Sequence, residues 1–250
     1  MRSASAWRYP TPCGSVGFVL QACLNGAREP GSHPSVPITP QQLAADAAEC
    51  AELGVTSFHL HPRDVVGLEV LAGPEVATSV SVVRSVVPHA EIGVTTGAWI
   101  VPDTVRRAEL VRGWAGLAAG RPDFASVNVH EDGWLAVADA VHDAGIGIEL
   151  GVFHVEAARA LLDVGVPPGT VRVLAEVRPG ETADHAARLL DLLRPLGVPV
   201  LLHGEDDSAW PVLDYALSLG LDTRIGLEDT LTSRDGTPAA DNAHLVRLAL

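Results

Sequence analysis

The sequence contains only three cysteines, Cys13, Cys23 and Cys50, and no two of them stand at a paired spacing. An odd number of cysteines without such a pair gives no disulfide framework and no cysteine-based zinc site. We therefore expect a protein of the reducing cytoplasm.

Positive charge is scarce as well. Lys and Arg number 17 against 31 Asp and Glu, the formal net charge is -14, and the basic residues form no run. This balance argues against nucleic acid and membrane surfaces as partners. It leaves small molecules, including anionic ones, because a few local arginines or a metal ion can dominate a pocket.

Long apolar runs are also missing, and no segment reaches the roughly 18 apolar residues that cross a membrane. The stretch VGFVLQACL, residues 16–24, has the apolar character of a signal-peptide core, but it lacks a small-residue cleavage site. We interpret it as a β-strand. The abundance of alanine and valine resembles the coding bias of high-GC bacteria.

The chain has 250 residues, 47% of them hydrophobic, which is the length of a (β/α)8 barrel. Short β-branched runs alternate with alanine- and leucine-rich segments of helical period, an order typical of a parallel sheet. We expect strands over residues 16–22, 55–60, 91–95, 123–129, 146–150, 170–176, 198–202 and 223–227. We expect helices to begin near Thr39, Pro74, Pro102, Gly133, His154, Glu181, Ser208 and Pro238. Eight such pairs predict an α/β fold, a (β/α)8 TIM barrel, in which residues 1–250 form a single domain with a loose N-terminal segment over residues 1–14.

Two histidines occupy alternate positions of the segment FHLHPRD, residues 58–64. His59 and His61 point the same way on a strand, and they face the barrel interior if Leu60 faces the helices. Two neutral imidazoles aimed at one point suit a divalent ion such as zinc. Two structural histidines are an equally good interpretation of this pair alone.

The segment RIGLED, residues 224–229, ends the last expected strand with two adjacent carboxylates. By alternation Arg224 and Glu228 share a face, and Asp229 turns onto the loop. Glu228 would then complete a site of two histidines and one carboxylate with open positions. The alternative is a buried ion pair between Arg224 and Glu228, with Asp229 as a cap.

Other polar residues collect at the expected carboxyl ends of the strands, where a TIM barrel has its active site. The candidates for substrate contacts are Thr95, Thr96, Gly97, Ser126, Asn128 and Glu149. Each has a structural alternative, since Thr-Gly turns and backbone-bonded Ser and Asn are common and an inward Glu is stable beside a cation. The segment HGEDD, residues 203–207, we interpret as a helix cap and a solvated turn.

Four segments resemble the β-keto acid cleavage enzymes, the family of 3-keto-5-aminohexanoate cleavage enzyme. They are NGAREPGSHPSVPITPQQLAADAAECAELGVTSFHLHPRD, VTTG, ASVN and RIGLEDTLTSRDGTPAADNAHLV, and together they span nearly the whole chain. The chain departs from the family in the first loop, where Arg28 stands at an acidic position and Glu29 follows, and in reading Thr-Thr-Gly-Ala for Ser-Thr-Gly-Gly. Relatives also usually continue beyond the position of Leu250.

The resemblance implies a TIM barrel that exchanges acyl groups between a β-keto acid and acetyl-CoA, giving acetoacetate and a new acyl-CoA. It implies a bound Zn2+ or another divalent metal, acetyl-CoA as co-substrate, and a homo-oligomer, a tetramer in similar enzymes. The implied metal ligands are His59, His61 and Glu228. Asp229 would be the base and Arg224 its partner. Thr95, Thr96, Gly97 and Ser126 would contact substrate oxygens, Glu149 a substrate amine, and Glu29 would take the acidic role of the first loop.

Two other classes compete with this interpretation. An amidohydrolase-type metal hydrolase also carries a His-x-His pair at a barrel strand, but it expects further histidines after the fifth and sixth strands. A catalytically degenerate zinc-binding barrel would retain the metal without turnover, although a structural zinc site needs four closed ligands and no neighbouring base.

Overall fold

The computed structural model describes residues 18–250. The expected loose segment 1–14 and the first residues of the expected first strand lie outside this range. Within it, the strands are β1 Leu20–Cys23, β2 Ser57–Leu60, β3 Glu91–Thr95, β4 Phe124–Asn128, β5 Gly147–Val152, β6 Thr170–Val177, β7 Val200–Gly204 and β8 Thr223–Ile225. The α-helices are α1 Pro40–Glu52, α2 Gly73–Val86, α3 Thr104–Arg112, α4 Trp134–Asp143, α5 Val155–Val164, α6 Ala183–Leu193, α7 Ala209–Leu219 and α8 Asn242–Ala249.

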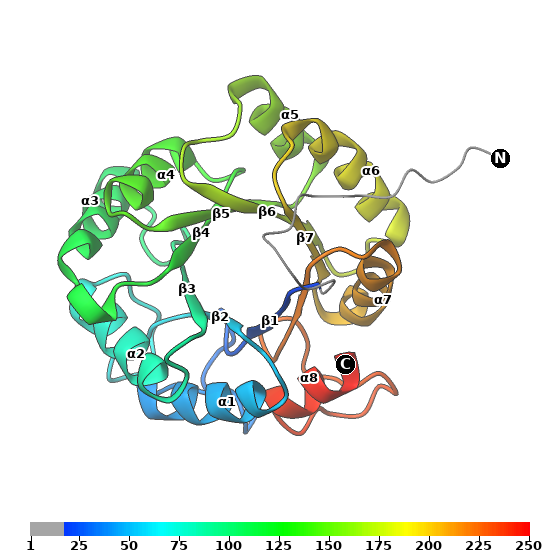
Figure 1. Ribbon diagram of the computed structural model, residues 1–250, viewed down its shortest axis with the longest axis horizontal. Helices are drawn as coiled ribbons and strands as arrows, with labels where there is room; N and C mark the ends of the chain where they lie inside the picture. Colours follow the sequence, from blue (N-terminus) through cyan, green and yellow to red (C-terminus); the bar gives the residue numbers. More distant parts are fainter. Residues whose placement is uncertain (1–17) are drawn as a thin grey trace.

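The strands form one parallel sheet that curls into a ring surrounded by the helices (Figure 1). The strand order is β7-β6-β5-β4-β3-β2-β1-β8. A parallel bridge between Leu201 of β7 and Asp222, next to β8, brings the two ends of the sheet together. The predicted (β/α)8 TIM barrel is therefore confirmed, and the carboxyl ends of all the described strands meet at one rim.

Local signals set the element boundaries. Thr39 caps α1 as expected: its side chain accepts a hydrogen bond from the Gln42 amide, and the Gln42 side chain accepts one from the Thr39 amide. The expected start of the last helix near Pro238 is wrong by four residues. Pro238 instead forms an antiparallel bridge with Thr232, and Asp241 caps α8.

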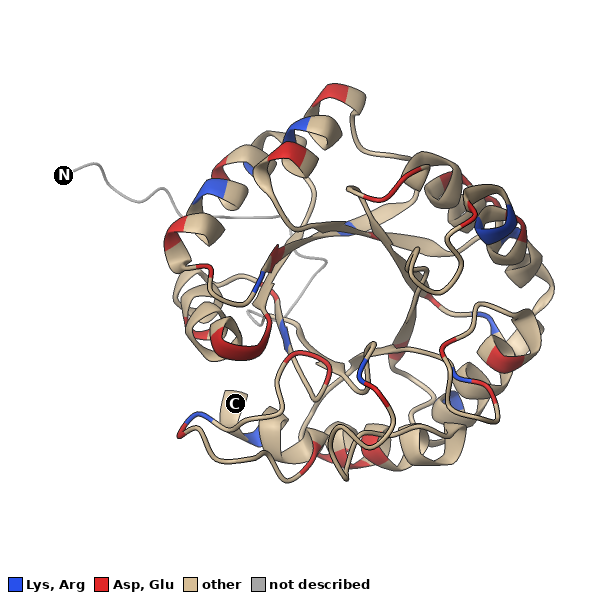
Figure 2. Cartoon of the chain, turned by 180° about the vertical axis from the view of Figure 1, so that it is seen from behind, with Lys and Arg blue, Asp and Glu red and all other residues tan. Residues whose placement is uncertain are grey.

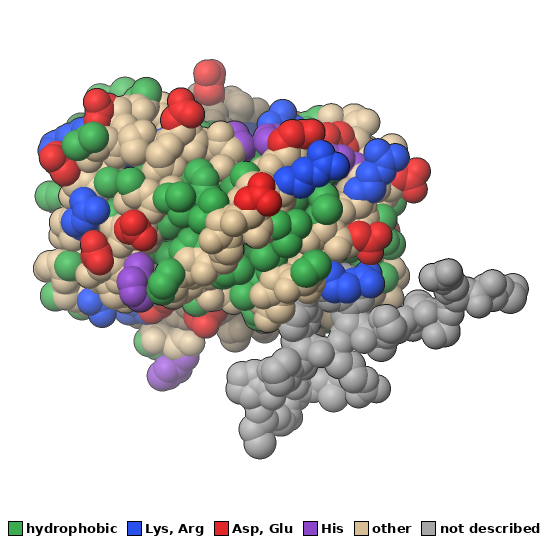
Figure 3. Space-filling model, turned by 90° about the horizontal axis from the view of Figure 1, so that it is seen from above, with side chains coloured by type: hydrophobic (Ala, Val, Ile, Leu, Met, Phe, Trp, Pro, Cys, Tyr) green, Lys and Arg blue, Asp and Glu red, His purple; other side chains and the backbone are tan. Residues whose placement is uncertain are grey.

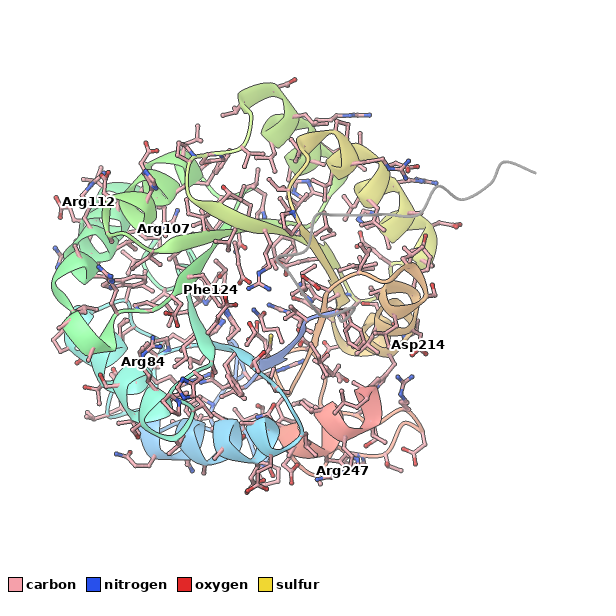
Figure 4. The ribbon with its side chains drawn as sticks, viewed as in Figure 1. Arg84, Arg107, Arg112, Phe124, Asp214 and Arg247 are labelled. Carbon is pink, nitrogen blue, oxygen red and sulfur yellow. The ribbon has the colours of Figure 1, made fainter. Side chains whose placement is uncertain are left out.

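The barrel has an apolar outer layer and a polar interior. The apolar cluster between the sheet and the helices includes Ala125 and Val127 of β4 but not Phe124. Phe124 lies at the inner wall of the ring, whereas Arg84, Arg112 and other labelled residues lie among the helices (Figure 4). Where the outer wall is seen from the side, apolar side chains fill the spaces between charged ones (Figure 3). Buried polar side chains of the strands, among them Gln21, Glu149 and Arg172, contact one another on this inner side.

Charged residues are spread around the outer helices, and a few strand positions inside the ring are charged too (Figure 2). Among the helices of residues 18–250, none combines the length and the apolar character that crossing a membrane requires.

Candidate metal centre and active-site cavity

β2 places both histidines of the FHLHPRD segment at the rim. His59 and His61 are 1% and 4% exposed, and their rings meet edge to face with centroids 5.2 Å apart. The backbone of His61 is fixed by Asn25, whose amide donates to the His61 carbonyl at 3.0 Å and accepts from the His61 amide at 2.9 Å. The predicted common direction of the two imidazoles is thus present.

β8 ends at Ile225, earlier than the sequence pattern predicted, and a turn follows in which the amides of Asp229 and Thr230 both donate to the Gly226 carbonyl. Because the chain turns here, strand alternation does not apply to Glu228 and Asp229. Both carboxylates reach the same guanidinium: Nη2 of Arg224 lies 3.0 Å from Oε1 of Glu228 and 2.9 Å from Oδ1 of Asp229. The expected separation of the two carboxylates is therefore wrong.

His59, His61 and Glu228 offer ligand atoms that all lie within 4.8 Å of one another. Oε2 of Glu228 lies 4.0 Å from Nε2 of His59 and 3.8 Å from Nε2 of His61. This oxygen is buried and accepts no hydrogen bond from any residue in the range 18–250. Ligands around zinc at their usual bond lengths stand about 3.4 Å apart. The three side chains therefore fit a divalent ion after a small contraction.

The ionisation states also suit metal binding. Burial lowers the pKa of His59 to about 3, so its imidazole is neutral near pH 7. Burial acts to raise the pKa of Glu228, but the charge of Arg224 and the nearby imidazoles outweigh it and lower this pKa to about 2. A neutral imidazole and an ionised carboxylate are the forms that coordinate a metal.

A buried polar chain lies next to this centre. Oδ1 of Asp229 accepts from Nε of Arg224 at 3.0 Å and lies 3.5 Å from Nδ1 of His203, whose Nε2 is 3.4 Å from Oε2 of Glu176. Burial and Arg224 act to lower the pKa of His203, but the two carboxylates raise it to about 9. The imidazole is then protonated at neutral pH and lies between the two carboxylates, and Nε of Arg224 lies 3.1 Å from its Nδ1.

The candidate ligands face a cavity of about 250 Å3. Its walls come from loops and strand ends around the whole rim: Ala27, Arg28, His59, His61, Thr95, Trp99, Ser126, Asn128, Phe153, Leu174, Glu176, Glu205, Asp206, Arg224 and Glu228. Asp229 is not among them. Its side chain is fully buried and lies behind Arg224.

Of the expected substrate contacts, Thr95, Ser126 and Asn128 line the cavity. The other two residues of the Thr-Thr-Gly segment have structural contacts. Thr96 donates its hydroxyl to the Ser126 carbonyl at 2.6 Å, and Gly97 lies against the Trp99 ring, which a Cβ at Gly97 would approach to 2.3 Å.

Glu149 and Glu29 lie away from the cavity walls. Glu149 is fully buried inside the barrel, where Arg172 lies 2.8 Å from its Oε1 and the Gln21 amide donates to the same oxygen at 3.1 Å. Arg172 also covers the Phe124 ring. Glu29 is exposed. Its neighbour Arg28 lines the cavity instead and pairs with Asp206 at 2.6 Å.

The interpretation of HGEDD as a cap and a solvated turn is confirmed for residues 205–207, where Glu205 caps the following 3-10 helix and Asp206 and Asp207 are exposed, but it missed the contacts of the segment with the site. His203 is buried against Asp229, and Glu205 and Asp206 line the cavity. Asp207 makes a loop contact, accepting a hydrogen bond from the Gly180 amide. The position of this segment directly after a predicted barrel strand was the signal that pointed to the site.

Comparison with known proteins shows the family of this chain. Residues 18–250 match the family described as beta-keto acid cleavage enzyme. The chain therefore belongs to the β-keto acid cleavage enzyme family, as its motifs predicted. The amidohydrolase alternative expected metal-binding histidines after the fifth and sixth strands. His154, two residues after β5, instead caps α5 by accepting from the Ala157 amide, and Arg178 follows β6.

Solved structures share the fold. The apo structure of ObcA is similar with a TM-score of 0.62 and 20% identity, covering 86% of this chain and 61% of that chain. ObcA also appears in a binary complex with oxaloacetate and in a ternary complex with a C4-CoA adduct and oxalate. This chain thus spans about three fifths of the length of ObcA. A type I 3-dehydroquinate dehydratase from Clostridium difficile is similar with a TM-score of 0.62 and 12% identity, covering 94% of this chain and 93% of that chain.

Proposed function

We propose that this protein is a zinc-dependent enzyme that exchanges acyl groups between a β-keto acid and acetyl-CoA. The bond between C2 and C3 of the β-keto acid breaks, and its C2 unit joins the acetyl carbonyl carbon to give acetoacetate. The released acyl group leaves on the coenzyme A sulfur as a new acyl-CoA. The observation that carries the proposal is the convergence of His59, His61 and Glu228 on a cavity, within a chain of this family.

The donor set supports zinc, since two imidazoles and one carboxylate leave a coordination position open for a substrate oxygen. A divalent ion bound there would act as a Lewis acid on the carbonyl of the β-keto acid. The remaining work belongs to the side chains of the cavity. Thr95, Ser126 and Asn128 line one wall, where their polar groups would hydrogen-bond substrate oxygens and fix the orientation of the acid.

Arg224 pairs with two carboxylates and also lines the cavity, where its guanidinium would face an anionic substrate oxygen. Asp229 is the proposed base. Its Oδ1 is occupied by Arg224, whereas Oδ2 is buried and has no hydrogen-bond partner in the described chain. Because Arg224 stands in front of Asp229, proton transfer to Oδ2 requires the guanidinium to move aside when substrate binds.

The substituent of the β-keto acid faces a wall of β6 and the loop after β7 in this proposal. Glu176 and Glu205 line the cavity there, and burial together with Glu176 raises the pKa of Glu205 to about 7. A cationic substituent would relieve this repulsion. We therefore assign the preference for such a substrate, which the sequence analysis assigned to Glu149, to these two residues.

By family resemblance we further propose that the protein is a cytoplasmic homotetramer. Light scattering of the purified protein would measure its oligomeric state.

The test is mass spectrometry of acyl-CoA products from purified protein, zinc, acetyl-CoA and a panel of neutral, anionic and amine-bearing β-keto acids. We expect acetoacetate and a matching new acyl-CoA from at least one acid, and no product from the His59→Ala variant. Zinc binding without any product across the panel would instead support the catalytically degenerate barrel.

A further inference from the structure

The Arg63–Asp64 pair behind the two histidines builds a tight hairpin over residues 63–69. Oδ1 of Asp64 accepts from the amides of Val66 and Leu68, both at 2.9 Å, and Arg63 pairs with Glu69 in an antiparallel bridge. The hairpin turns at Gly67, whose φ of +89° favours glycine.

Arg63 fixes this hairpin to the neighbouring loop. Its side chain is 6% exposed and donates to the carbonyls of Gly67 at 2.8 Å, Gly26 at 2.9 Å and Arg28 at 2.5 Å. These hydrogen bonds connect the loop after β1 to the loop after β2 beside the metal centre, and they fix the position of the end of the hairpin.

Glu69, at that end, reaches back to the metal centre. Its Oε1 accepts from Nδ1 of His61 at 2.5 Å, and its Oε2 accepts from the indole Nε1 of Trp99 at 3.1 Å. A proton on Nδ1 leaves the lone pair of Nε2 free, and this is the nitrogen that faces Glu228. His59 has no such support, because its Nδ1 is buried without a hydrogen-bond partner in residues 18–250.

Trp99 belongs to both the cavity and this carboxylate. Its ring stacks on His61 with centroids 6.2 Å apart and an interplanar angle of 22°, and it is 52% exposed at the cavity wall. One carboxylate thus holds a candidate metal ligand with one oxygen and a wall of the cavity with the other.

We propose that Glu69 is a positioning residue that orients His61 for metal binding and couples the indole of Trp99 to occupancy of the metal centre. The inference rests on the metal centre of the proposed function. Outer carboxylates that hold a ligand histidine typically contribute a factor of about 10 to 100 in metal affinity. Because the two hydrogen bonds share one carboxylate, a change at His61 on metal binding is transmitted to Trp99, and the energetic coupling is reciprocal.

The test measures metal binding and indole emission without substrate. Zinc affinity is measured by competition with a chromophoric chelator for the wild type, Glu69→Gln and Trp99→Phe, with Glu52→Gln at the exposed end of α1 as the matched control. We expect Glu69→Gln to bind zinc about 10- to 100-fold more weakly and Glu52→Gln to bind it as the wild type does. We expect zinc to change tryptophan emission in the wild type, and this change to disappear in Trp99→Phe and to shrink in Glu69→Gln at saturating zinc.

Three results would overturn the inference. The first is a folded Glu69→Gln variant that binds zinc as tightly as the wild type. The contact between Glu69 and His61 would then be a structural ion pair only, most clearly if the substitution lowered the stability of the metal-free protein and nothing else. An unchanged emission response in saturated Glu69→Gln would remove the coupling to Trp99. If the wild-type protein bound no zinc, both the metal centre and the zinc-dependent mechanism would be refuted. If all variants bound zinc equally, the role of Glu69 would be refuted and the zinc-dependent mechanism would still stand.

Discussion

Replacement of Glu228 by glutamine tests the metal centre with the smallest change in shape. With its pKa lowered to about 2, Glu228 is ionised at neutral pH, so the substitution removes a full charge. It also removes the oxygen that faces His59 and His61. A charge-assisted contact of this kind is worth about 1.5–3 kcal/mol. Metal affinity should therefore fall by roughly 10- to 100-fold.

The same change has a defined effect on thermal stability. At a zinc concentration about 100 times the wild-type Kd, binding stabilises the folded protein by about 2.7 kcal/mol. If the Kd rises about 100-fold, the stabilisation falls to about 0.4 kcal/mol. A protein of 250 residues loses about 2–4 °C of Tm per kcal/mol. The zinc-dependent part of the Tm should thus drop by about 5–9 °C.

The assay is calorimetry of both proteins with zinc and with a chelator. The difference between the two conditions isolates the metal contribution from the loss of the Arg224–Glu228 ion pair, which lowers the stability of the metal-free variant as well. An equal zinc-induced rise in Tm for the wild type and Glu228→Gln would refute Glu228 as a ligand.

Three further predictions concern residues in and around the site. Asp229→Asn should retain zinc affinity within about threefold and lose at least about 100-fold in turnover, as expected for a general base; loss of zinc together with turnover would merge the separate roles of Asp229 and Glu228. Glu205 has a folded pKa of about 7, above its unfolded value, so it binds more protons in the folded state and stability should fall as pH rises from about 4.5 to 7. Chemical denaturation across that range should show a smaller fall for Glu205→Gln, and identical slopes would contradict the assignment. Gly226→Ala places a Cβ 1.9 Å from the backbone carbonyl oxygen of Cys23, which cannot move aside cheaply, so it should cost about 1–3 kcal/mol of stability. Gly116→Ala, with open space around it, should not, and the free energies of unfolding of the two variants decide between these outcomes.

The sequence predicted well those features that depend on local periodicity. His59 lies within β2 and His61 follows directly after its last residue, Leu60, so the period of two still applies to this pair. The order of strands and helices predicted the barrel for the same reason. Glu228 does not reach the metal centre by strand alternation, because β8 ends at Ile225 and the turn after it places the carboxylate there.

The sequence did not predict how far along the barrel axis an inward-facing side chain lies. Alternation correctly turned Glu149 inward, but whether an inward residue reaches the cavity depends on the stagger of neighbouring strands and on what fills the layer around it. Here Arg172 and Gln21 occupy that layer with Glu149. The roles of Arg28 and Glu69 were hidden in a similar way, because loop side chains meet partners that no periodic pattern predicts.

The most direct test of the central claim follows the carbon atoms. Purified protein with zinc, [1-13C]acetyl-CoA and an accepted β-keto acid should place the label at C3 of acetoacetate, while the new acyl-CoA remains unlabelled and carries the acyl group of the acid. Labelled acetate in place of labelled acetoacetate would show hydrolysis of the thioester and would contradict acyl exchange at this centre.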